Sequence, residues 1–121
     1  MPLTVLPESG QTTLCLGYSG LITVDDIHQV FGTDFNNWFA RNNIDRLYLR
    51  FDQDFQGWTE DAAATSIKFI MGSLGYLQRV AHVNAPDSRR LMSSMLSPVS
   101  TAEIRHFETG EEEKAMKWLT E

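Results

Sequence analysis

Two aspartates, Asp52 and Asp54, lie in a short loop that directly follows an apolar run, Leu47 to Phe51. In parallel α/β proteins, ligands bind beyond the carboxyl ends of the strands. A D-x-D pair there is typical of phosphotransfer enzymes in which one carboxylate attacks phosphorus and both help to hold Mg²⁺. That chemistry needs a cationic partner and further carboxylates, and the later strand ends offer no lysine. We therefore expect no enzyme, and keep a Mg²⁺-dependent phosphotransferase as a minor alternative.

The histidines and the single cysteine have no metal-ligand spacing. His82 and His106 fall at the fourth position of two strand-like runs, so they could approach each other on neighbouring strands. A zinc site would need a third ligand, and Cys15 is the only thiol. We expect two polar groups on a sheet, a structural thiol, and no cofactor.

The helix predicted from Thr59 to about Leu77 is the least usual segment. Lys68 is the only charged residue between Ala62 and Gln78. At ~100° per residue the helix has two apolar stripes, and both need cover. The stripe expected to cover the sheet consists of Ala63, Ile67, Ile70, Met71, Leu74 and Leu77. The opposite stripe consists of Ala62, Thr65, Phe69, Gly72 and Tyr76.

Several partners could cover the second stripe. Neighbouring helices could fill it within one core; a second subunit or an apolar ligand could cover it instead. A predicted downstream helix over residues 91–96 adds methionines, whose flexible side chains suit permissive binding surfaces. The candidate residues of an apolar ligand-binding groove are Phe55, Trp58, Phe69, Tyr76, Leu91, Met92 and Met95.

Short strands and helices must position these side chains. Runs at residues 3–6 and 12–18 are expected to form an antiparallel hairpin. Thr23 is a good N-cap for a helix that would kink or split at Gly32. Strands are predicted at 47–51, 79–83 and 103–107, and Thr109 is predicted to cap a last helix, with Glu112 completing a capping box. The order β-β-α-β-α-β-α-β-α predicts a mostly parallel mixed sheet of about five strands covered by helices, in one domain over 1–121.

The charge and hydrophobicity of the chain limit the kinds of partner that it can bind. The chain has 121 residues, 16 acidic against 10 basic, and a formal charge of −6. Nucleic-acid binding needs clustered Lys and Arg, so we expect no nucleic-acid partner. The start of the chain has no signal-peptide pattern, and no stretch approaches the ~18 apolar residues of a membrane span. A cytoplasmic protein without a transmembrane segment is expected.

Several runs resemble the SpoIIAA-like family, and the resemblance extends over nearly the whole chain. They are Leu47-Tyr48-Leu49-Arg50-Phe51, Phe55-Gln56-Gly57-Trp58-Thr59, Lys68-Phe69, Arg79-Val80-Ala81-His82-Val83, Ser97-Pro98, Glu103-Ile104-Arg105-His106-Phe107 and Ala115-Met116-Lys117-Trp118-Leu119. The resemblance implies a STAS-type fold, related to the lipid-carrier domain of SEC14 and CRAL-TRIO proteins. Two departures stand out. The loop from Asp52 to Trp58 lacks the serine that STAS regulators phosphorylate, and Asn84-Ala85 replaces a family Gly-Asp.

The functional prediction combines the resemblance with the two-sided helix. We expect a non-enzymatic STAS-type domain that binds an apolar small molecule or lipid, or touches a membrane surface, through the 58–96 helical region. Because the chain is acidic, peripheral membrane contact should be hydrophobic. The alternative is a homodimeric protein-interaction module without the phosphoserine switch, which would use the same helix.

Overall fold

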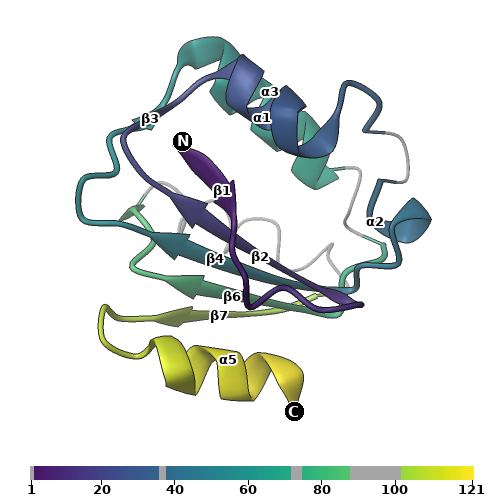
Figure 1. Ribbon diagram of the computed structural model, residues 1–121, viewed down its shortest axis with the longest axis vertical. Helices are drawn as coiled ribbons and strands as arrows, with labels where there is room; N and C mark the ends of the chain where they lie inside the picture. The colour runs from purple at the N-terminus through teal and green to yellow at the C-terminus, as the bar shows by residue number, and fades with distance from the viewer. Residues whose placement is uncertain (1, 36–37, 72–74, 88–101) are drawn as a thin grey trace.

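The computed structural model describes residues 2–35, 38–71, 75–87 and 102–121 (Figure 1). Five strands form the main sheet in the order β1-β2-β4-β6-β7. They are β1 (Leu3–Val5), β2 (Thr13–Tyr18), β4 (Arg46–Phe51), β6 (Arg79–Val83) and β7 (Glu103–Phe107). β1 pairs antiparallel with β2, and the other pairings are parallel. The predicted mostly parallel mixed sheet and its opening hairpin are confirmed.

Two further short strands form a second sheet that the sequence did not reveal. β3 (Leu21–Ile22) and β5 (Gly57–Trp58) pair in parallel. The Gln56 amide donates to the Gly20 carbonyl at 2.8 Å, which extends the contact. Strands of two residues carry no alternation pattern to detect. Their pairing ties the acidic loop after β4 to the exit of β2.

The first predicted helix is split as expected. α1 (Val24–Phe31) begins at Thr23, whose side chain and that of Asp26 form a reciprocal capping box. It ends at Gly32, whose φ of 76° favours glycine. α2 (Trp38–Arg41) follows as a separate turn of helix. Both helices carry aromatic side chains that meet α3 (Glu60–Met71).

The sheet is covered on both sides, with α1 and α3 on one face and α5 (Glu112–Thr120) on the other (Figure 1). A hydrophobic core lies on each face of the sheet, and alternate residues of a strand point into one core or the other. In β4, Leu47, Leu49 and Phe51 face the first core. Tyr48 faces the second, with Ala115, Trp118 and Leu119 from α5.

The predicted orientation of α3 is wrong. Ala62 is fully buried and Phe69 packs into the first core, while Ile67 and Met71 are 47% and 52% exposed. Both stripes are apolar, so hydrophobicity alone could not choose between them. The aromatic ring has the larger area to bury, and its side of the helix faces inward. α3 also ends earlier than predicted, because Gly75 and Tyr76 form a turn.

The predicted cap of the last helix is also wrong. α5 begins at Glu112 with Glu111 as its N-cap, and Thr109 is exposed. The Glu111 carboxylate accepts a hydrogen bond from the Glu108 amide at 2.8 Å, and that of Glu112 accepts one from the Gly110 amide at 3.1 Å. The Glu108 amide lowers the pKa of the Glu111 carboxyl, and the amides of Glu112 itself and then of Gly110 lower the pKa of the Glu112 carboxyl. Glu111 therefore holds the N-cap position without a side-chain hydrogen bond to the helix, and the cap predicted at Thr109 is not formed.

The predicted helix over 91–96, with Leu91, Met92 and Met95, lies outside the described residues. Within the described ranges, no helix has the length and apolar character needed to cross a membrane.

Candidate functional site

Phe69, from the predicted groove, lies in a cluster of aromatic rings. Its ring centroid is 4.5 Å from that of Phe31, 5.1 Å from Phe35 and 5.0 Å from Phe39. Trp38 lies 6.0 Å away. The segment from α1 to α2 therefore covers the Phe69 side of α3 from within the chain.

Phe55 and Trp58 belong to a second aromatic cluster, at the carboxyl end of β4. Their ring centroids are 4.9 Å apart, and both rings contact Tyr18 and Phe51. Among the described residues Phe69 makes its ring contacts with Phe31, Phe35, Trp38 and Phe39 and not with the rings of Phe55 and Trp58, although all three side chains pack against the same core. The structure therefore brings Phe55 and Trp58 together, but does not bring them to Phe69.

The outward side of α3 carries the exposed apolar residues. Ile67 and Met71 lie one turn apart, and Tyr76 is 37% exposed in the following turn. The sequence analysis missed Ile67 and Met71 as surface residues. A signal was present, because at ~100° per residue Glu60 falls between Ile67 and Met71, and Lys68 lies toward the same side. We call Ile67 and Met71 the exposed apolar stripe.

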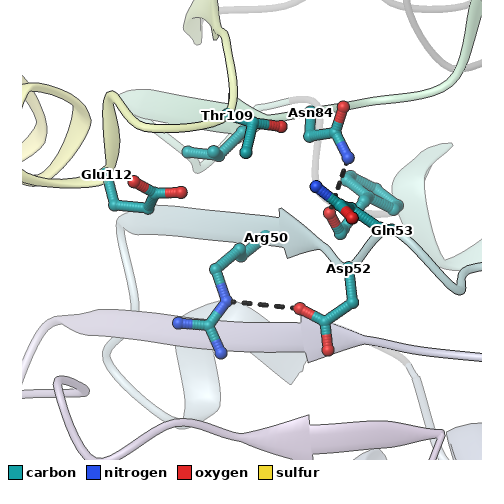
Figure 2. Close-up of a pocket in the computed structure, with 8 residues that line it drawn as sticks. Arg50, Asp52, Gln53, Asn84, Thr109 and Glu112 are labelled. Carbon is teal, nitrogen blue, oxygen red and sulfur yellow. Dashed lines mark hydrogen bonds and ion pairs between the residues drawn. The ribbon is translucent and has the colours of Figure 1, made fainter.

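The acidic loop borders a polar cavity of about 100 Å³ (Figure 2). The cavity lies where β4 and β6 end and α5 begins, which is the ligand-binding edge of parallel sheets. Asp52 lines it, but Asp54 is not among its lining residues. The lining residues are Arg50, Phe51, Asp52, Gln53, Val83, Asn84, Thr109 and Glu112.

Arg50 is the cation that the sequence analysis did not find. Its Nε lies 3.6 Å from the Asp52 Oδ1 (Figure 2). This partner lies two residues before the aspartate at the end of the same strand, and not at the end of a later strand as the phosphotransfer chemistry would require. Since alternate strand residues share a face, the spacing itself was a usable signal. Arg50 also helps to lower the pKa of the Glu112 carboxyl, after the larger effect of its backbone hydrogen bonds.

Asn84 fixes the edge of the cavity. Its φ is 58°, a left-handed conformation that glycine adopts readily and asparagine tolerates. Its side-chain Nδ2 donates to the Phe51 carbonyl at 3.0 Å, and its backbone amide donates to the Phe107 carbonyl at 2.9 Å. Asn84 thus adopts a backbone conformation that glycine favours and adds a side chain to the cavity.

The histidine pair is confirmed in position. His82 and His106 are register partners on β6 and β7, and their ring centroids are 4.8 Å apart in a stacked arrangement. Within the described part of the chain, no group of three or more His, Cys, Asp or Glu side chains could hold a metal ion.

The Thr59 hydroxyl and the Cys15 thiol both have structural roles. The Thr59 hydroxyl accepts from the Ala62 amide at 3.3 Å and donates to Asp61 at 2.6 Å, as expected of a helix cap. Cys15 is fully buried in β2, and burial raises its pKa to about 11. A thiol with such a pKa is a poor nucleophile near neutral pH.

A parallel sheet opened by an antiparallel hairpin, with helices on both faces, defines a SpoIIAA-like α/β fold. The family model described as SpoIIAA-like matches residues 13–120, and the chain belongs to that family. Its fold is similar to a crystal structure of an uncharacterized protein of the DUF3478 family, with a SpoIIAA-like fold, from Shewanella loihica PV-4. That similarity has a TM-score of 0.68 at 17% identity and covers 97% of this chain and 91% of that chain. No match was found among curated proteins.

Proposed function

We propose that this chain is a non-enzymatic SpoIIAA-like domain that binds lipid at a membrane surface through the outward side of α3. The observation that carries the proposal is the exposed apolar stripe, in which Ile67 and Met71 are about half exposed one helical turn apart. An apolar ligand bound within the 58–96 helical region is the closely related possibility.

The neighbouring charge fits a lipid surface. Lys68 is exposed beside Ile67, and it is the only charged residue of α3 after Asp61. A lysine next to apolar side chains can bury its carbon stem while its ammonium reaches lipid phosphates. The chain as a whole has a charge of −6, so attraction to anionic lipid should contribute little.

The expected binding is weak and reversible. Fully burying an Ile or Met side chain is worth roughly 1.5–3 kcal/mol. Both side chains are already half covered, so together they should contribute about 2–3 kcal/mol at a bilayer surface. Contact of this strength depends on apolar burial and should change little with salt.

The absence of catalysis is part of the proposal. The Asp52 carboxylate forms an ion pair with Arg50, so the nearest cationic side chain is already engaged. Asp54, the second member of the D-x-D pair, is exposed and is not among the lining residues of the cavity. This arrangement supports the interpretation of the loop as a solvated acidic loop and argues against a phosphotransfer site.

Vesicle flotation tests the proposal with a matched pair of double variants. Ile67→Glu with Met71→Glu should abolish flotation with phosphatidylcholine vesicles at both low and high salt. The control, Val5→Glu with Leu21→Glu, adds the same charge at side chains that are 48% and 44% exposed, and should float like the parent protein. Equal loss in both variants, or no flotation of the parent, would contradict lipid binding.

Sedimentation of the same proteins separates lipid contact from self-association. A lipid-binding surface predicts a monomer for the parent and both variants. A parent dimer that becomes a monomer only with Ile67→Glu and Met71→Glu would replace the proposal with the homodimeric interaction module.

A further inference from the structure

We propose that the cavity at the carboxyl ends of β4 and β6 binds a neutral polyhydroxyl group with adjacent hydroxyls, such as the end of a polyol or sugar. The site is separate from the exposed apolar stripe and does not depend on lipid binding. It is built from side chains of three segments that the parallel sheet brings to one edge: the end of β4, the end of β6 and the start of α5.

The charges of the cavity exclude simple ions as the best ligands. Asp52 and Glu112 are both acidic and would repel a carboxylate or phosphate. The Glu108 and Gly110 amides, just before α5, already donate to the carboxylates of Glu111 and Glu112, so these two amides are not available to an anion. A cation at Asp52 would have to compete with the Arg50 guanidinium, whose Nε already lies 3.6 Å from the carboxylate. A neutral ligand avoids both penalties.

The hydrogen-bonding groups of the cavity that stay available to a ligand include both donors and acceptors. Within the described structure, the Nη groups of Arg50 and the Oδ2 of Asp52 make no hydrogen bond or ion pair. The Thr109 hydroxyl and the Gln53 amide likewise make none there, and Asn84 uses its Nδ2 but keeps its Oδ1. A hydroxyl group both donates and accepts, so two adjacent hydroxyls can bond to a guanidinium and a neighbouring carboxylate at once.

Figure 2 shows how these groups are arranged. Arg50 and Asp52 lie together, joined by the dashed ion pair, and Gln53 and Asn84 stand beside Asp52. Thr109 and Glu112 come from the side of α5. A ligand in the cavity would therefore be contacted from β4, β6 and α5 together.

The size of the cavity limits what can enter. A volume of about 100 Å³ has room for a few water molecules, each with a share of ~30 Å³ in the liquid. That space fits a unit of about three to five non-hydrogen atoms, such as the diol of a larger molecule, and the rest of a polyol or sugar ring would lie outside the cavity. Phe51 and Val83 complete the lining and give the ligand's CH groups an apolar contact.

Amide-detected NMR titration tests the site with named probes. Glycerol and myo-inositol should produce saturable shifts at the Gln53 and Asn84 side chains and at the Gly110 amide. Propane-1,2-diol should bind more tightly than propane-1,3-diol, because only the former has adjacent hydroxyls. Acetate and ethylammonium should give no saturable shift at these groups.

Matched variants assign the effect to the cavity. Arg50→Gln should weaken glycerol binding roughly tenfold, since hydrogen bonds to a charged group are lost. Arg41→Gln removes another exposed arginine, paired with Asp34 at 3.8 Å, and should leave binding unchanged. If Arg50→Gln fails to fold, Gln53→Ala, on the exposed loop, should still weaken binding several-fold. Saturation by acetate, no saturable shift with glycerol, or equal binding by the parent and both cavity variants would overturn the proposal.

Discussion

Phe69 and Ile67 are two residues apart on α3 and lie in opposite environments. Phe69 is surrounded by aromatic rings from α1 and α2, whereas Ile67 is about half exposed. Both sides of the helix are apolar in sequence, so composition does not separate core from surface. The two sides differ in their packing partners. Four aromatic rings from the preceding part of the chain, those of Phe31, Phe35, Trp38 and Phe39, pack on the Phe69 side of α3.

The comparison changes the expected role of Phe69. A residue covered by its own chain contributes to stability, and an uncovered residue is available to something outside the chain. The functional interest therefore moves from Phe69 to Ile67 and Met71.

Truncating Phe69 should have the largest effect. Phe69→Ala should lower the free energy of unfolding by about 3 kcal/mol, because the ring loses its aromatic contacts and leaves a cavity. Ile67→Ala, which removes a half-exposed side chain, should cost under about 1 kcal/mol. Urea unfolding followed by tryptophan fluorescence measures both, and equal losses would show that the two sides of α3 are not different.

Removing the cap of α1 should have a smaller effect on the same cluster. Thr23→Ala breaks the capping box with Asp26 and should cost about 1 kcal/mol. Because α1 supplies Phe31, the loss should also raise hydrogen exchange near Phe69. Thr109→Ala is the matched control, since the Thr109 hydroxyl does not cap α5, and its effect should stay within about 0.5 kcal/mol. A larger loss at Thr109 than at Thr23 would contradict the assigned caps.

Much of the fold could be predicted from the sequence because its signals are local. Alternating apolar residues marked the strands, and Thr23 and Gly32 marked both ends of α1. The pairing of β3 with β5 could not be predicted, since two residues carry no period. The start of α5 was missed because Glu111, and not the expected threonine, holds the N-cap position, with its carboxylate bonded to the preceding Glu108 amide.

The candidate sites were harder to predict because they depend on contacts between distant segments. Parallel pairing placed Asp52 and Asn84 at one edge, and α5 added Glu112 to the same cavity. The ion pair of Asp52 with Arg50 was available from strand alternation alone. The environment of Phe69 could not be predicted from the pattern of its own helix, since it depends on aromatic rings that other segments bring to α3.

The measurement that tests the central claim most directly is a polarity-sensitive fluorophore on the outward side of α3. Cys15 is fully buried with a raised pKa, so a cysteine introduced by Met71→Cys should be the only residue labelled under native conditions. With phosphatidylcholine vesicles, the label at position 71 should shift to shorter wavelength, and a label introduced by Val5→Cys should not. An unchanged spectrum at position 71, or equal shifts at both positions, would contradict lipid contact through α3.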